Sequence, residues 1–245
     1  MIEQPRSWRL ERNGNAVFAA VGAEFTCYAE SAGPFGSGAR NPAWQLTLSW
    51  DGEVVVTDEQ GRETAGRGVL VSPGLPHTMR HPNGFTALWI DPHRLAAPPG
   101  VHALDAIQVR RLFAALGDDL DPDRLRRTVN REIGEPPPVD PRLIRALAIL
   151  DQGASLEELA GHVGLSARRL RQLSAPLGTS LTTLRRWHRV REAGLLLPFF
   201  PAAEVAVRVG FADQAHLIRS MAESTGHTPG SALAAVGGGV ATELR

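Results

Sequence analysis

Lysine is absent from this chain, and cysteine occurs once. All 26 basic residues are therefore arginine, which is what a GC-rich coding bias produces and carries no mechanistic weight alone. The single cysteine, Cys27, excludes an internal disulfide and a cysteine-rich zinc site. A lone cysteine in a β segment is more often buried and inert than a redox switch.

Long hydrophobic runs are also missing. The N-terminal stretch MIEQPRSWRLERNGN contains no apolar segment of the kind a signal peptide needs. The longest apolar run, AGLLLPFF from residue 193, is too short to span a bilayer. We therefore expect a cytoplasmic protein that does not interact with membranes.

The common signatures of enzymes are absent as well. The chain has no G-x-S-x-G elbow, no Walker loop and no dinucleotide-binding glycine fingerprint. The GGG run at 237–239 falls in a segment, 236–245, that we predict to be a flexible tail. We expect no catalytic residue and no cofactor.

Length and composition indicate a soluble protein of two domains. The chain has 245 residues, of which 43% are hydrophobic and 21% charged. Its net charge is zero but unevenly distributed: residues 1–136 hold fourteen arginines against seventeen acidic residues, and residues 137–235 hold eleven against eight. The basic excess lies in the C-terminal part.

The sequence pattern of the first hundred residues predicts β structure. Short β-branched runs alternate with turn residues, and LSWDGEVVV predicts two strands joined as a hairpin at Asp51-Gly52. A further strand, FTALWI, follows Gly84. Many short strands separated by turns favour a barrel or sandwich over residues 1–100.

The pattern changes to helical after residue 100. Apolar residues at helical spacing predict a helix over 104–117, and Asp121-Pro122 supplies the cap and first-turn proline of another over 121–133. We interpret residues 101–136 as a helical connector. The proline-rich run EPPPVDP, 135–141, is then the main domain boundary.

Residues 137–235 predict an all-helical domain. Each expected helix is preceded by a capping residue or a proline, and Ser155 with Glu158 forms a capping box. The other expected starts are Asp140-Pro141, Ser166, Ser180, Pro201 and Asp213.

A short sequence motif occurs twice in this domain. Glu158-Leu159-Ala160 aligns with Glu204-Val205-Ala206 at an offset of 46, and the helices that follow align at an offset of 47. Each copy reads as a helix, a turn containing glycine and a second helix, which is the helix-turn-helix pattern. The small alanine lets the second helix cross closely over the first.

Two such copies joined by a helix indicate DNA binding. The joining segment SLTTLRRWHRVREAGLLL would span about 27 Å at about 1.5 Å per residue, comparable with the spacing of about 34 Å between successive major-groove faces. Seven arginines and no acidic residue lie between residues 166 and 191, which favours contact with phosphates.

At these residues the sequence resembles the AraC-type (AraC/XylS) transcriptional regulators. The likeness covers about residues 140–233 and is strongest in EVAVRVGFADQAHLIRSMAESTGHTPGSAL. Leu217 and Met221 replace phenylalanines usual in the family, and Ser174 replaces another in the first copy, where Pro176 follows in a segment one residue short. The first recognition helix is therefore expected to end early.

The resemblance implies which residues face DNA. Arginine can pair with guanine and glutamine with adenine, so we expect base contacts from both recognition helices: Arg168, Arg171, Gln172, Gln214, Ala215, His216 and Arg219. We assign to phosphates, or to the plain protein surface, the arginines that would add affinity without reading sequence: Arg169, Arg185, Arg186 and Arg189.

The resemblance also implies a cupin-like barrel in the N-terminal domain, which senses a small molecule or mediates dimerisation. GRGVLVSPGLPHTMRH looks like the second cupin motif and contains His77. The chain has no His-x-His pair, and prolines flank His77 and His81, so we expect no metal. Four residues are candidates for lining a ligand pocket, with ordinary core packing as the alternative: Trp44, Trp50, His77 and Trp89.

These observations predict a multidomain α+β protein with a cupin-like barrel, a helical connector and a double helix-turn-helix domain. The expected function is sequence-specific transcription regulation, with double-stranded DNA, a small-molecule effector, a second copy of the chain and RNA polymerase as candidate partners. The connector helices are the expected dimer or interdomain surface. Two alternatives stay open: a metal-dependent cupin enzyme with a helical appendage, and an interaction module that has lost DNA binding.

Overall fold

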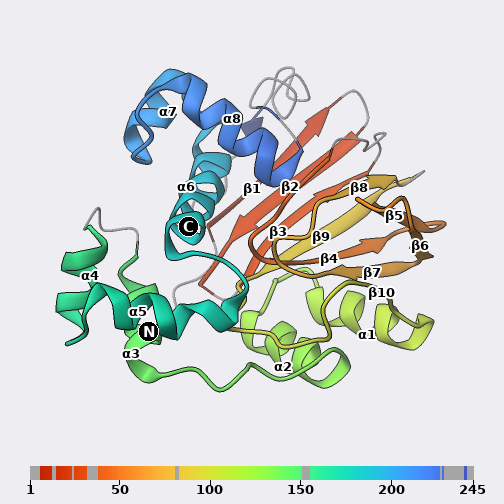
Figure 1. Cartoon of the computed structure of the whole chain (residues 1–245). Helices are drawn as coiled ribbons and strands as arrows, with labels where there is room; N and C mark the ends of the chain where they lie inside the picture. The colour runs from red at the N-terminus through yellow and green to blue at the C-terminus, as the bar shows by residue number, and fades with distance from the viewer. Residues whose placement is uncertain are drawn as a thin grey trace.

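A β domain and a set of helices lie side by side in the computed structural model of this chain (Figure 1). The structure describes residues 6–12, 15–23, 25–31, 38–80, 83–150, 155–226, 228 and 240–241. This arrangement, an N-terminal β domain followed by an all-helical C-terminal domain, confirms the predicted fold class. Of the predicted tail at 236–245, all but 240–241 lies outside the described residues.

The β domain consists of two antiparallel sheets. The larger has the strand order β10-β7-β4-β9-β3-β2-β1-β11 and the smaller β6-β5-β8. Apolar side chains from β5, β7 and β8 pack together between them, among them Val56, Val69 and Met79. The strand bounds are β1 Arg6–Arg12, β2 Asn15–Val21, β3 Phe25–Glu30, β4 Trp44–Ser49, β5 Val54–Asp58, β6 Glu63–Gly66, β7 Gly68–Val71, β8 His77–Arg80, β9 Phe85–Ile90, β10 Val101–Ala103 and β11 Val240–Ala241.

The hairpin predicted at Asp51-Gly52 is wrong. Both strands exist, as β4 and β5, but they belong to different sheets. β4 already pairs with β7 on one side and β9 on the other, so no edge is left for β5. Instead β5 forms its hairpin with β6, through a turn closed by the hydrogen bond from the Asp58 amide to the Arg62 carbonyl.

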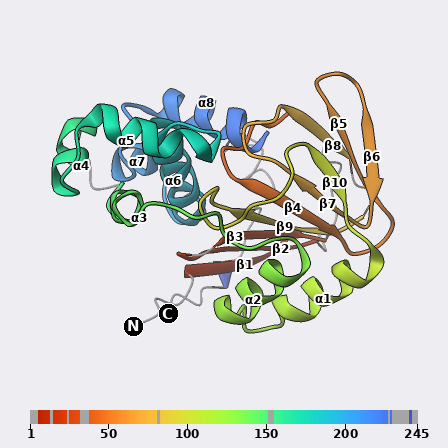
Figure 2. The same cartoon turned by 60° about the horizontal axis from the view of Figure 1, so that its bottom comes forward.

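Helices α1 (Ala106–Leu116) and α2 (Pro122–Glu132) cover one face of the larger sheet, and Figure 2 shows them side by side against it. Leu112 and Leu125 are buried in the same cluster as Leu46 and Leu88 of the sheet. The segment 101–136 is thus packed into the core of the β domain, and its first residues form β10, which the helical pattern did not predict.

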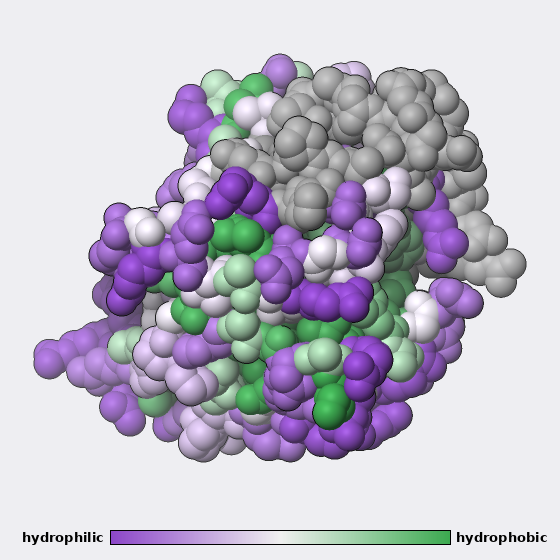
Figure 3. Space-filling view, turned by 90° about the vertical axis from the view of Figure 1, so that its right-hand side faces the viewer, coloured by the Kyte–Doolittle hydropathy of each residue, from purple (hydrophilic) through white to green (hydrophobic). Residues whose placement is uncertain are grey.

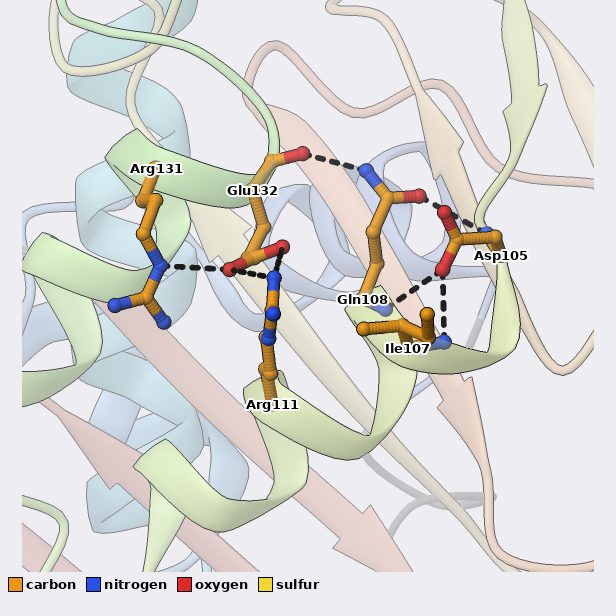
Figure 4. A network of polar contacts seen from close by, with 6 residues as sticks. All are labelled: Asp105, Ile107, Gln108, Arg111, Arg131 and Glu132. Atoms are coloured by element: carbon orange, nitrogen blue, oxygen red, sulfur yellow. Dashed lines mark hydrogen bonds and ion pairs between the residues drawn. The ribbon is translucent and has the colours of Figure 1, made fainter.

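A polar network fixes α1 to α2 (Figure 4). The Gln108 side chain donates to the Glu132 carbonyl at 2.6 Å, and Arg111 forms an ion pair with the Glu132 carboxylate at 3.2 Å. Arg131 donates to the same carboxylate at 2.7 Å, and these contacts lower the pKa of Glu132. Asp105 caps α1 in a capping box with Gln108. The two helices therefore behave as one layer.

The C-terminal helices begin where the capping residues predicted. Asp140, Ser155, Ser166, Ser180 and Asp213 each accept a hydrogen bond from the first turn that follows. The capping box of Ser155 and Glu158 is present. The helix bounds are α3 Pro141–Ala148, α4 Leu156–His162, α5 Ala167–Ser174, α6 Leu181–Leu196, α7 Ala202–Arg208 and α8 Gln214–Thr225, with a 3-10 turn, η1, at Ala175–Leu177.

Candidate nucleic-acid interface

The sequence repeat is also a structural repeat. Helices α4 and α7 have seven residues each and start 46 positions apart, and α5 and α8 start 47 apart. The amide of Leu165 donates to the Ala160 carbonyl at 2.9 Å, and the amide of Phe211 donates to the Ala206 carbonyl at 2.8 Å. We call α3–α5 the first unit and α7–α8 the second unit.

Each unit turns at a glycine with a left-handed backbone. Gly164 has φ 68° and Gly210 has φ 83°. A side chain is disfavoured at such angles, so glycine permits the turn between the helices, which is four residues long in the first unit (163–166) and five in the second (209–213). The alanines before the turns, Ala160 and Ala206, are fully buried where the helices cross.

The first recognition helix is the shorter one. α5 has eight residues and α8 has twelve. Ser174 is buried at the end of α5, where its hydroxyl donates to the Arg171 carbonyl, and the chain continues as the 3-10 turn that contains Pro176. The early end predicted for this helix is confirmed.

The residues predicted to face bases lie on exposed surfaces of α5 and α8. All are exposed except His216, which is half-buried with its ring edge-on to Phe211 at 5.0 Å. Arg171 has a distant ion-pair partner, Glu157, at 3.9 Å. The buried faces of the helices are apolar, with Leu170 and Leu217 fully covered. The polar side chains of α5 and α8 are thus presented to solvent, while the apolar side chains pack inward.

Three of the four arginines assigned to phosphates are bonded to groups on other elements of the protein. Arg185 donates to the Leu150 carbonyl at 2.8 Å, and Arg189 donates to the Gly210 carbonyl at 2.6 Å. Arg186 forms an ion pair with Glu223 of α8 at 3.1 Å. Arg169 is exposed and donates to the neighbouring side chain of Gln172. Arg169 thus keeps the best access to phosphates.

Helix α6 connects both units, and Figure 1 shows it between them. Its first half packs with the first unit, through Leu181 and Leu184. Its second half packs with the second unit, through Val190 and Ala193 among others. The distance between the two recognition helices, α5 and α8, is therefore determined by where each unit packs along α6.

The other side of α6 contacts the β domain through a buried ionic cluster. Asp91, which follows β9, lies 3.3 Å from His188 Nε2 and 3.6 Å from Arg191 Nη1. Burial alone would raise the pKa of Asp91, but the adjacent Arg191 and His188 hold it below its usual range. Sequence reasoning missed this cluster, because nothing in the local pattern relates Asp91 to α6.

Aromatic packing reinforces the same contact. Trp89 of β9 meets Trp187 of α6 edge-on at 5.8 Å. Val17 of β2 packs with Leu195 of α6. The cluster that holds the second unit also contains Ala43 of the β domain. The β domain is thus in direct contact with α6 and the second unit.

The four predicted pocket residues are distributed over the β domain. Trp44 is buried in the cluster beneath α1 and α2, Trp89 packs against α6, and Trp50 is 42% exposed. Core packing, the alternative left open by the sequence, accounts for Trp44 and Trp89, whereas Trp50 lies partly on the surface. His77 borders a cavity of about 380 Å³ between the smaller sheet and α8.

The surroundings of His77 are polar. Its Nδ1 lies 2.9 Å from the Leu75 carbonyl, and burial lowers the pKa of the ring, so Nδ1 donates and Nε2 is an acceptor. Nε2 is buried without a hydrogen-bond partner among the described residues. The cavity is also bordered by charged side chains, namely Arg40, Asp58, Glu59 and Glu223.

The other candidate sites offer fewer reactive groups. In the described ranges, no three His, Cys, Asp or Glu side chains gather as a metal site. Burial raises the pKa of Cys27 to about 12, which leaves it as an unreactive thiol. No helix in the described part of the chain is long and apolar enough to cross a membrane.

Comparison with known proteins agrees with this geometry. A family model described as a helix-turn-helix domain matches residues 159–235. No curated protein sequence matches the chain. An apo ToxT variant from Vibrio cholerae strain SCE256 covers 88% of this chain and 98% of its own, with a TM-score of 0.59 and 10% identity.

Two further ToxT structures are similar over nearly the whole chain. ToxT from Vibrio cholerae in its P21 crystal form covers 96% of this chain and 99% of its own, with a TM-score of 0.56 and 8% identity. Wild-type ToxT from strain SCE256 with a bound unsaturated fatty acid covers 94% and 95%, with a TM-score of 0.52 and 11% identity. Identities this low show a common fold. The matched helix-turn-helix model indicates a regulator rather than a cupin enzyme. This chain is therefore a DNA-binding transcription regulator whose C-terminal part is an AraC-type helix-turn-helix domain, joined to an N-terminal β domain in the fold of ToxT.

Proposed function

We propose that this protein reads a specific DNA sequence with two recognition helices, α5 and α8, placed in neighbouring major grooves. The observation that carries the proposal is the duplicated unit on one connecting helix, with matching turns and exposed polar side chains on both second helices. Arginine and glutamine at these positions suit guanine and adenine, with about 1–3 kcal/mol of discrimination for each good bidentate pair.

Selection of binding sites tests this function directly. The purified full chain is used to enrich duplexes from a random library, and affinity for the selected duplex is measured by fluorescence anisotropy at two salt concentrations. We expect Arg219→Ala to lower the preference for the selected duplex by about tenfold, while Arg80→Ala, at an exposed arginine of β8, leaves it unchanged. Equal weakening on all sequences would make Arg219 a phosphate contact.

We infer that the β domain controls DNA binding through α6. The buried cluster of Asp91, His188 and Arg191 and the Trp89–Trp187 contact connect the two directly. A change in the β domain would then move α6 and the second unit together. This coupling supplies a route from an effector to the DNA-reading helices.

The cavity beside His77 is our candidate effector site. It lies between the smaller sheet and α8, and the Arg40 amide donates to the Glu223 carbonyl there, so an occupant would touch both domains. Its lining includes four charged side chains but presents mostly apolar surface, which suits a small ligand with both polar and apolar parts. A panel of small metabolites of this kind screened by thermal shift tests this. A compound that stabilises the wild type and His77→Phe equally binds elsewhere.

We also propose a homodimer formed through α1 and α2. Ile107 of α1 is 50% exposed. Figure 3 shows the outer side of the β domain as mostly hydrophilic, with apolar patches in the lower part of the view. Sedimentation velocity is expected to show a dimer that Ile107→Glu dissociates. A wild-type monomer at all concentrations would contradict the proposal.

A further inference from the structure

Two arginines of α6 each hold one DNA-reading unit by its backbone. Arg185 Nε donates to the carbonyl of Leu150, which follows α3 in the first unit, at 2.8 Å. Arg189 Nη1 donates to the carbonyl of Gly210, in the turn of the second unit, at 2.6 Å. Both carbonyls follow the C-terminal end of a helix, where a positive charge is favourable. These bonds fix backbone positions rather than mobile side chains.

Both arginines lie on one face of α6. Residues four apart on a helix have Cβ atoms about 5–6 Å apart. The end of α3 and the turn of the second unit are therefore both bonded to side chains on the same face of α6, one helical turn apart. The apolar contacts lie at separate ends of α6, with Leu184 in the cluster of the first unit and Val190 in that of the second. The hydrogen bonds of Arg185 and Arg189 therefore restrain the rotation of one unit relative to the other about the axis of α6.

We propose that Arg185 and Arg189 are positioning residues that determine which separation between two DNA half-elements the protein accepts. The inference rests on the proposed function, because it concerns how the two recognition helices are spaced. One inserted base pair shifts one half-element by about 3.4 Å and rotates it by about 35°. A rigid connection between the units resists this change, so a wrongly spaced site binds less tightly.

A phosphate contact is the competing role for these arginines, and it has a different signature. Each phosphate contact adds affinity for every sequence and steepens the salt dependence by about 0.9 in the logarithmic slope. A positioning role changes the preference for spacing and leaves that slope unaltered. Measurements of both quantities on the same variants therefore separate the two roles.

Position 185 allows a matched pair of variants. In Arg185→Gln, the side-chain nitrogen lies as many bonds from Cα as the arginine Nε, so it can donate to Leu150 without carrying charge. In Arg185→Met, the chain length is similar but no donor is left. The full-length variants are titrated by anisotropy, over several salt concentrations, against the duplex selected by the wild type and versions with one base pair inserted or removed between the half-elements. Arg80→Met, at an exposed arginine of β8, is the control, and thermal melts check that each variant is folded.

The spacing preference is the ratio of the affinity for the selected duplex to the affinity for a duplex with one base pair inserted or removed. We expect this ratio to be about fivefold lower in Arg185→Met than in the wild type, as for the loss of one hydrogen bond. Arg185→Gln is expected to stay close to wild type, with an unchanged salt slope in both variants, and Arg189→Met to behave like Arg185→Met. The proposal is overturned if both variants at position 185 reduce the salt slope by about one while keeping the spacing preference. It is equally overturned if folded Arg185→Met retains the full preference. A wild type that selects no duplex would refute the proposed function itself, and the positioning role with it.

Discussion

At the scale of single residues, arginines of the same chain serve different purposes. Arg219 is exposed on α8, Arg189 donates to a backbone carbonyl, and Arg191 lies in a buried cluster with Asp91. The sequence places all of them in one basic stretch or its repeat, and only the structure separates their roles. A count of arginines therefore overestimates the surface available to phosphates.

The turn of the second unit offers a residue-scale prediction. Gly210→Ala places a Cβ 3.2 Å from Arg189 Cζ at a backbone angle, φ 83°, that side chains rarely adopt. We expect a loss of about 1–2 kcal/mol in the free energy of unfolding, measured by chemical denaturation. Gly161→Ala is the matched control, since its Cβ meets nothing within 4 Å and it lies in α4, where alanine is expected to stabilise by about 0.5–1 kcal/mol. A neutral Gly210→Ala would contradict the tight turn.

At the scale of elements, the helices were more predictable than the strand pairing. Ser155, Ser166 and Asp213 mark helix starts because capping depends on residues within one turn. Strand pairing depends on partners distant in sequence, which is why the Asp51-Gly52 turn did not join β4 to β5. Likewise, β10 is only three residues long and shows no period of its own.

Helix crossing in the second unit gives a prediction at this scale. Ala206 is fully buried beneath α8, so Ala206→Leu forces α7 and α8 apart and is expected to destabilise the protein by about 1–3 kcal/mol. Ala203→Leu, on the exposed side of the same helix, is expected to be neutral. Denaturant titration of both variants checks this. Equal stabilities would mean that α8 does not pack on Ala206.

At the scale of the whole molecule, the contact between the β domain and α6 determines how an effector bound to the β domain could influence DNA binding. Asp91 and α6 are far apart in the chain, and their meeting depends on the complete fold. The same holds for Trp89, which the sequence suggested for a pocket and which instead packs on Trp187. The sequence could predict the secondary-structure class of each domain, because strands and helices each have their own hydrophobic periodicity.

The Asp91 cluster yields a pH prediction. Asp91→Asn leaves Arg191 without its buried partner and is expected to cost about 3 kcal/mol of unfolding free energy near neutral pH. The folded pKa of Asp91 lies below the unfolded value of about 3.9, so this contribution is complete above that value and is lost as the pH falls through the folded pKa. The gap in unfolding free energy between wild type and variant, measured by denaturation between pH 8 and pH 3, should therefore persist down to pH 5 and narrow only in more acidic solution. Glu53→Gln, an exposed change, should show no gap. A gap that narrows between pH 8 and pH 5 would contradict a carboxylate held ionised by Arg191.

The proposed function requires one chain to place two recognition helices in neighbouring major grooves. Hydroxyl-radical footprinting of the full-length protein on its selected duplex measures this placement. We expect two protected windows per protomer, about 10 base pairs apart on one face of the duplex, with Arg168→Ala weakening one window and Arg219→Ala the other. A single window, unaffected by Arg168→Ala, would show that the short helix α5 does not enter a groove.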